Sequence, residues 1–185
     1  MEKILRLFFR THATLINISF LLLLNAVMIL VIIPEASQGV IMGTEQSELI
    51  DRFFFFTSAD FYPVISGYGD TGRTNYVFML LTADIVFSIL YSVLLVFLAV
   101  VFYEKLNFTS LKKWIFFPLI FPVIEGLENV LLIFLLVSYP VKHPLLANFL
   151  GGSIMLKWCM LFSFLLVFFS GALLTFIKYV KKKAT

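Results

Sequence analysis

The most constraining feature of this sequence is its four long runs of apolar residues. The runs cover about residues 13–33, 76–103, 114–139 and 153–177. The hydrocarbon core of a bilayer is about 30 Å thick, and about 20 helical residues cross it. Runs of this length are typical of helices, which satisfy their own backbone hydrogen bonds inside lipid. The sequence therefore predicts an all-α, polytopic membrane protein with four transmembrane helices.

The composition excludes the main alternatives for a chain of this size. Hydrophobic residues make up 61% of the sequence and charged residues 14%, whereas about 25% charged residues is usual in a soluble domain. A soluble domain, a disordered chain and a nucleic-acid-binding module are therefore excluded. The single cysteine, Cys159, rules out an intrachain disulfide. With only two histidines, we expect no metal and no cofactor.

The distribution of basic residues predicts the orientation in the membrane. Ten Lys and Arg residues lie before the first run, between the second and third runs, and after the fourth, whereas the other two connections contain three. Cytoplasmic flanks carry the excess of Lys and Arg. Both termini are therefore predicted to be cytoplasmic, in an antiparallel four-helix bundle that forms a single membrane domain, residues 1–185.

The long connection 34–75 is predicted to lie on the outer side, and it carries three local signals. Phe53–Phe56 are four consecutive phenylalanines, which we expect to pack on helix ends or in the interface rather than in water. Thr57 and Asp60 have the spacing of a helix capping box. Glycines between residues 67 and 72 predict turns.

Four ionisable side chains fall inside the apolar runs. They are Asp84 in the second run, Glu125 and Glu128 in the third, and Lys157 in the fourth. A central charge costs about 2.5–3.5 kcal/mol on insertion scales, so such groups face the bundle interior and find partners. At a rise of about 1.5 Å per residue, all four lie in the outer half or the middle of the membrane. They are predicted to meet in one layer.

Helical spacing supports this convergence. In the second run, Asp84, Ser88 and Tyr91 follow the i, i+4, i+7 pattern of one helix face. One face of the third run consists of Pro118, Pro122, Glu125 and Asn129. The two prolines are predicted to kink this helix on its cytoplasmic side, because each removes a backbone hydrogen bond.

Three intramembrane carboxylates outnumber the one intramembrane lysine. Polar contacts that only hold the helices together explain one or two carboxylates, and this structural interpretation stays open. A third carboxylate is better explained by a polar cavity. The predicted ligand-binding residues are Asp84, Tyr91, Glu125, Glu128 and Asn129, with Arg73 and Lys157 as counter-charges.

The sequence from Gly69 onward resembles a group of small four-span membrane proteins. Its pattern reads G-D-T-G-R-T-N-Y, then Asp84 and Tyr91, then an acid followed by Glu-Asn in the third run. The resemblance covers about residues 57–136 and implies no activity. In that group the acid before Glu-Asn is usually Asp, where this chain has Glu125. The resemblance implies that a single set of residues belongs together: Arg73, Tyr76, Asp84, Tyr91, Glu125, Glu128 and Asn129.

More loosely, the layout is similar to the EXPERA superfamily, the emopamil-binding and sigma-2-receptor-like proteins. Its members are four-span proteins that bind sterols or hydrophobic amines through intramembrane carboxylates, and some isomerise a sterol double bond. The resemblance implies that Asp84 and Glu125 are the corresponding acids. Asn25 stands where the first span would carry an acid, and the isomerases' catalytic histidine has no counterpart, so isomerase activity is not expected.

Three functional interpretations stay open. The first is a bundle that binds or carries a small hydrophobic or cationic ligand, a lipid or a proton. The second is a non-catalytic subunit or assembly factor of a larger membrane complex. The third is a lipid- or sterol-modifying enzyme, for which no nucleophile–base pair is evident. The expected partners are membrane lipids, a hydrophobic or amine ligand, and a second copy or a larger complex, without nucleic acid.

The sequence leaves two membranes open. A bacterial inner membrane fits the orientation. In a eukaryote, the last four residues, Lys182-Lys183-Ala184-Thr185, fit a dilysine retrieval signal and indicate the endoplasmic reticulum.

Overall fold

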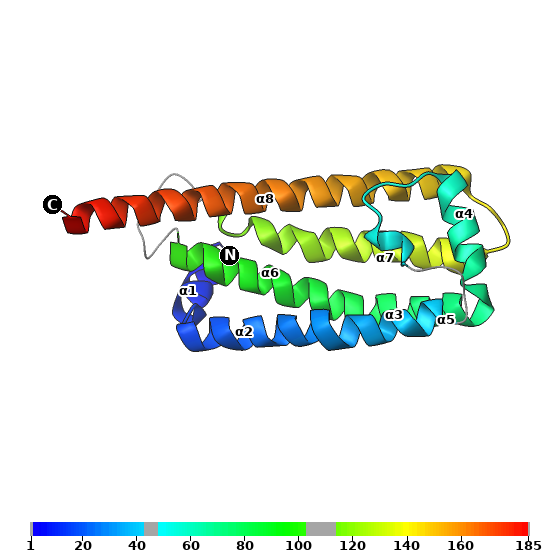
Figure 1. The fold of residues 1–185 in the computed structure, drawn as a ribbon, viewed down its shortest axis with the longest axis horizontal. Coiled ribbons are helices and arrows are strands. Elements are labelled where there is room, and N and C mark those ends of the chain that lie inside the picture. Colours follow the sequence, from blue (N-terminus) through cyan, green and yellow to red (C-terminus); the bar gives the residue numbers. More distant parts are fainter. Residues whose placement is uncertain (1, 43–47, 103–113, 185) are drawn as a thin grey trace.

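The structure, a computed structural model, describes residues 2–42, 48–102 and 114–184, and no strand occurs in these ranges. Four long helical stretches lie side by side along the long axis (Figure 1). They are Leu15–Ile41, Gly69–Val100, Phe117–Ser138 and Pro144–Gly171, each long and apolar enough to cross a membrane. For the described residues, the predictions of an all-α fold and of four helices long and apolar enough to cross a membrane are confirmed.

Two of the stretches contain a π-helical turn. The first consists of α2 (Leu15–Val27), a π turn (Met28–Ile32) and α3 (Ile33–Ile41). The second consists of α5 (Gly69–Met79), a π turn (Leu80–Asp84) and α6 (Ile85–Val100). The third is a 3-10 turn (Phe117–Ile120) followed by α7 (Phe121–Ser138), and the fourth is α8 (Pro144–Ala184). The shorter elements are α1 (Glu2–His12), a 3-10 turn (Ile50–Arg52) and α4 (Ser58–Gly67).

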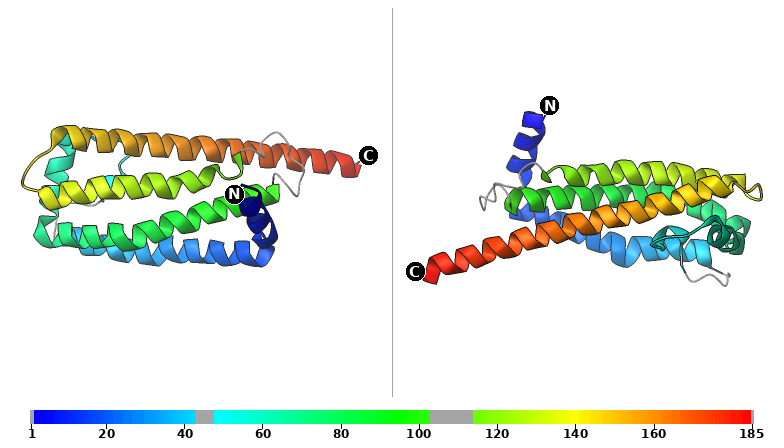
Figure 2. Two further views of the ribbon diagram at one scale, coloured as in Figure 1. Left: turned by 180° about the vertical axis from the view of Figure 1, so that it is seen from behind. Right: turned by 90° about the horizontal axis from the view of Figure 1, so that it is seen from above.

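The long helices pack in chain order. Helix α2 packs against α6, α3 against α5, and α7 against both α6 and α8. Figure 2 shows α1 standing across the direction of the long helices, and the C-terminal part of α8 extending beyond them. Apolar side chains such as Leu23, Val130 and Leu166 are 61–72% exposed on the outside of these helices. Such a surface is suited to lipid rather than to water.

The first long helix does not end at residue 33 as predicted, because it continues through Pro34 to Ile41. In the π turn before the proline, the Ile33 N–H bonds back to the Met28 carbonyl, one residue further than in an α-helix. This wider turn accommodates a proline ring, and Pro34 itself has no N–H to leave unpaired.

The connection between the first and second helical stretches is consequently shorter than the predicted 34–75. The second stretch begins at Gly69 rather than near residue 76, and Gly69 has φ +65° at the junction of α4 and α5. Helix α8 begins at Pro144 rather than near residue 153, in keeping with the preference of proline for the first helical turn. Tyr103 and the basic residues of the second connection lie outside the described residues, as does Glu45.

The segment 48–57 folds back onto the helices. Phe56 is buried and its ring stacks on Phe61 at 5.6 Å, whereas Phe54 and Phe55 are each 51% exposed. The capping box is confirmed, because the Thr57 N–H donates to Asp60 Oδ2 at 2.9 Å and the Thr57 hydroxyl donates to the same oxygen. The backbone bond and then the hydroxyl bond hold the pKa of Asp60 below its usual value.

Two buried tyrosines, one at the junction of α4 and α5 and one in α5, form hydrogen bonds to this segment. The Tyr68 hydroxyl accepts from the Ile50 N–H at 3.0 Å and donates to the Glu48 carbonyl at 3.1 Å. The Tyr76 hydroxyl donates to Asp51 Oδ1 at 2.6 Å and accepts from the Asp51 N–H at 3.3 Å. Burial raises the pKa of Tyr68. Both hydroxyls therefore act as neutral donors and acceptors.

Tyr76→Phe is expected to lower the free energy of unfolding by about 1–3 kcal/mol, because Asp51 loses a buried partner. Tyr139→Phe is the matched control, since the Tyr139 hydroxyl donates to Ser66 Oγ at 3.0 Å in an exposed position where water replaces it. Equilibrium unfolding in mixed detergent micelles measures both variants. Equal losses of unfolding free energy in the two variants would contradict a stabilising role for the Tyr76–Asp51 hydrogen bonds.

Candidate functional site

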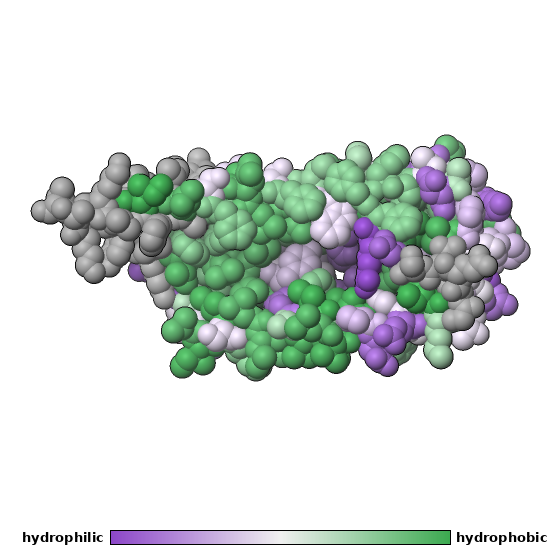
Figure 3. All heavy atoms as spheres, viewed as in Figure 1, coloured by the Kyte–Doolittle hydropathy of each residue, from purple (hydrophilic) through white to green (hydrophobic). Residues whose placement is uncertain are grey.

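A cavity of about 700 Å³ lies among the four helical stretches. Its polar lining residues are Asp51, Arg52, Asp84, Ser88, Tyr91, Glu125, Lys157 and Trp158. Its apolar lining residues include Ile29, Ile33, Met79, Phe87, Leu94, Leu95, Leu161 and Leu165. Figure 3 shows the hollow on one face of the molecule, with hydrophilic residues inside it and along its right side and hydrophobic surface on the other sides. An apolar cavity with a few convergent polar groups is the usual form of a small-molecule site.

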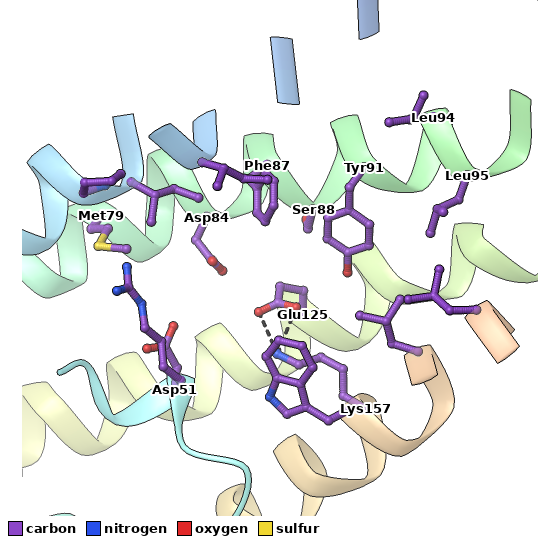
Figure 4. Close-up of a pocket in the computed structure, with 17 residues that line it drawn as sticks. Asp51, Met79, Asp84, Phe87, Ser88, Tyr91, Leu94, Leu95, Glu125 and Lys157 are labelled. Atoms are coloured by element: carbon purple, nitrogen blue, oxygen red, sulfur yellow. Dashed lines mark hydrogen bonds and ion pairs between the residues drawn. The ribbon is translucent and has the colours of Figure 1, made fainter. Parts of the chain in front are cut away.

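Lys157 on α8 joins the two acids of α7. Its Nζ donates to Glu125 Oε1 at 2.9 Å and to Oε2 at 3.0 Å (Figure 4). The same Nζ lies 2.7 Å from Glu128 Oε2. All three side chains are buried. Glu125 and Glu128 reach the same lysine because residues three apart share a helix face. The structure thus brings together the acids and the base that the sequence placed in one layer.

Asp84 lies at the end of the π turn and pairs with α7. The Asn129 amide donates to Asp84 Oδ2 at 2.7 Å and to the Leu80 carbonyl at 3.2 Å. The amide therefore inserts into the helix where the π turn widens it. Within the described residues, Asp84 has no basic partner at ion-pair distance. Its carboxylate is thus held by a neutral amide and faces the cavity.

The predicted face of the second helix is present. Figure 4 shows Asp84 from the π turn and Ser88 and Tyr91 from α6 pointing toward the space in front of Glu125, and all four line the cavity. The Ser88 hydroxyl is tied to its own helix, since it donates to the Ile85 carbonyl at 2.8 Å. The i, i+4, i+7 spacing therefore aims three polar side chains at one cavity.

Arg73 lies apart from this cluster. It donates to the Ile65 carbonyl at 3.2 Å, pairs with Asp70, and lies 4.5 Å from the Tyr139 ring centroid. It is eleven residues before Asp84, or about 16 Å along a helix, which explains why it does not line the cavity. The basic residues that line the cavity are Lys157 and Arg52.

The two prolines of the third run do not kink the middle of a helix. Pro118 lies in the 3-10 turn and Pro122 in the first turn of α7. At these positions the missing N–H is one that the helix would leave unpaired, so proline begins the helix instead of bending it. Neither residue lines the cavity.

Sequence reasoning missed Asp51 and Arg52, which reach the cavity from the connecting segment. Arg52 Nη2 donates to Ser37 Oγ on α3 at 2.7 Å. The available signal was weak: a charged pair between the apolar residues Leu49-Ile50 and the phenylalanine run. Trp158 was missed as well, and its buried indole nitrogen has no hydrogen-bond partner among the described residues.

The charges at the cavity are unequal. Three carboxylates (Asp51, Asp84 and Glu125) and two cations (Arg52 and Lys157) line it, and a fourth carboxylate, Glu128, pairs with Lys157 without lining the cavity. Lys157 already serves two of the acids. Such an arrangement can receive a positively charged group, because a buried carboxylate in a low-dielectric setting gains strongly from a cationic partner.

The four apolar helices define the class of protein, an all-helical integral membrane protein that crosses the bilayer several times. Compared with protein-family models, curated proteins and solved structures, the chain gives no match. The functional conclusions below therefore come from its own residues.

Proposed function

We propose that this chain binds or carries a small amphipathic ligand with a cationic amine group in the cavity lined by Asp84 and Glu125. The bundle is antiparallel with both termini in the cytoplasm, so the cavity lies in the outer half to the middle of the bilayer. This topology is supported by the excess of Lys and Arg in the predicted cytoplasmic flanks. It fits a bacterial inner membrane or, in a eukaryote, the endoplasmic reticulum.

The observation that supports this proposal most directly is that Asp84 lines the cavity without a basic partner among the described residues. Its carboxylate lines the cavity, yet the only side chain that bonds it in the described residues is the neutral Asn129. Purely structural acids in a bilayer pair with bases, as Glu125 and Glu128 do with Lys157. An ammonium group in the cavity would supply the missing charge, and Leu94 and Leu95 would surround the ligand's apolar part. The layout resemblance to amine-binding EXPERA proteins agrees with this role.

Asp84→Asn tests the proposal with little structural change. The side-chain oxygen of the introduced asparagine still accepts from Asn129, so the helix contact is kept while the negative charge is lost. Binding of dodecylamine to the reconstituted protein is expected to weaken by about ten- to hundredfold, the loss of one charge-assisted hydrogen bond. Trp158, in the cavity wall, provides the fluorescence signal.

The matched control is Asp70→Asn, which removes the same charge from a side chain that is 97% exposed outside the cavity. It is expected to bind dodecylamine as the wild-type protein does. The proposal is overturned if Asp84→Asn binds as tightly as wild type, or if both variants weaken equally.

A further inference from the structure

The cavity is open along one side of the bundle. Helices α2 and α3 have α6 and α5 as their main packing partners, whereas α8 packs against α7 and α4. Both sides nevertheless line the cavity, with Ile29 and Ile33 from the first stretch and Leu161 from α8. Figure 3 shows the resulting hollow on the face between them, with hydrophobic residues to its left and above and below it, and hydrophilic residues along its right side. In a bilayer, an opening with such surroundings faces lipid.

The cavity offers a group of each sign at the same end. Arg52 and Asp84 both line it, and neither forms an ion pair with another described residue. Arg52 is exposed and donates to the neutral hydroxyl of Ser37. An amine alone would use the carboxylate and leave the guanidinium without an anion. A guanidinium is the side chain best suited to phosphate, because its planar donors bind two oxygens at once.

The cavity also has a polar end and an apolar end. In Figure 4, Asp51 and Asp84 lie toward one end, and Leu94 and Leu95 lie toward the other. Asp84 and Leu95 are eleven residues apart on one helical stretch, or about 16 Å. Beside the cavity, the Trp158 indole N–H is a donor without a partner among the described residues. A buried donor of this kind suits a ligand that brings its own oxygen acceptors.

We propose that the ligand is a phospholipid with a primary-ammonium headgroup, which enters sideways from the bilayer between α8 and the Met28–Ile32 turn of the first helical stretch. Its phosphate binds Arg52, its ammonium binds Asp84, and an acyl chain lies along Leu94 and Leu95 and leaves through the open side. This inference rests on the proposed function and names the ligand class of the same cavity. Of the common phospholipids, phosphatidylethanolamine carries both required groups, and phosphatidylglycerol carries only the phosphate.

Lipid retention tests the assignment. The full-length protein is reconstituted in vesicles of equal parts phosphatidylethanolamine and phosphatidylglycerol and re-extracted in mild detergent, and the retained lipid is measured by mass spectrometry. We expect the wild-type protein to retain phosphatidylethanolamine about tenfold over phosphatidylglycerol. Arg52→Gln is expected to abolish this preference. Asp84→Asn is expected to lose both the lipid preference and the binding of dodecylamine.

The control variant is Lys142→Gln, which removes a positive charge from the connection before α8, outside the cavity. It is expected to keep the lipid preference. If Arg52→Gln retains phosphatidylethanolamine like wild type while Asp84→Asn still loses dodecylamine, the lipid assignment is overturned and the proposed function stands. If dodecylamine binding does not depend on Asp84, the proposed function itself fails. If water-soluble phosphoethanolamine displaced the bound lipid, the proposed entry of the ligand from the bilayer would be overturned.

Discussion

Lys157→Met is expected to lower the free energy of unfolding by about 3–5 kcal/mol, because it leaves two buried carboxylates without their shared cation. Lys157 Nζ lies within 3.0 Å of both Glu125 oxygens and 2.7 Å from Glu128 Oε2. Both acids are buried, with exposed fractions of 8% and 5%, so neither recovers its full hydration when the ammonium is removed. Equilibrium unfolding in mixed detergent micelles measures the loss.

The triple variant Lys157→Met, Glu125→Gln, Glu128→Gln separates charge from packing. Removing all three charges leaves side chains of similar volume and no buried ion, so most of the stability is expected to return. The ion cluster is then not needed for folding as such. A Lys157→Met variant within about 1 kcal/mol of wild type would show that water reaches this cluster freely.

Gly151→Ala is expected to destabilise the protein by about 3 kcal/mol, the effect of forcing an atom into a closed contact. A Cβ at Gly151 would lie 2.0 Å from the Phe56 carbonyl oxygen, a backbone atom that cannot rotate away. Relief would require the 48–57 segment to leave α8, where the Ser58 N–H also donates to Asn148 Oδ1 at 2.6 Å. The melting temperature in detergent reports the change.

The adjacent glycine is the matched control. A Cβ at Gly152 would have nothing within 4 Å, so Gly152→Ala is expected to stabilise the helix by about 0.5–1 kcal/mol through its higher helix propensity. The two neighbouring substitutions should therefore change stability in opposite directions. A stable Gly151→Ala protein would mean that the segment does not rest on α8.

The part of the site that lies on the long helices was predictable from sequence. Asp84, Glu125 and Lys157 stand out because charges inside apolar runs are costly and must converge. Helical spacing then places Ser88 and Tyr91 beside Asp84. This reasoning needs only the helical spacing of the polar residues and the free-energy cost of a charge inside an apolar run. Both can be read from the sequence itself.

Arg52 was beyond that reasoning for a physical reason. It lies in a short irregular segment. The path of this segment is set by contacts between residues far apart in the sequence, such as the Tyr76–Asp51 hydrogen bonds and the close packing of Phe56 on Gly151. Such contacts leave no periodic trace in the chain. Arg73 was predicted as a counter-charge because it belongs to the recognisable G-D-T-G-R-T-N-Y pattern. Its position on the helix, however, places it away from the cavity.

The helix ends illustrate the same limit. Pro34 and the glycines near residue 70 are usual signs of a helix boundary, and Gly69 does mark one. At Pro34, however, the preceding π turn absorbs the proline and the helix continues. A π turn has no clear signature in a single sequence, because it depends on how neighbouring helices pack.

The two π turns, Met28–Ile32 and Leu80–Asp84, carry a consequence for how this chain tolerates change in length. A π turn holds one residue more than the α-helical turn it replaces, and one residue corresponds to about 100° of rotation. Losing a single residue at Leu80–Asp84 would turn the π turn into an α-helical turn with nearly the same rotation, so Tyr76 and Ser88 would keep their present directions. The same loss in the regular helix Ile85–Val100 would rotate the residues on its two sides by about 100° relative to each other. A one-residue deletion should therefore be tolerated better in the π turn than in the regular helix beside it.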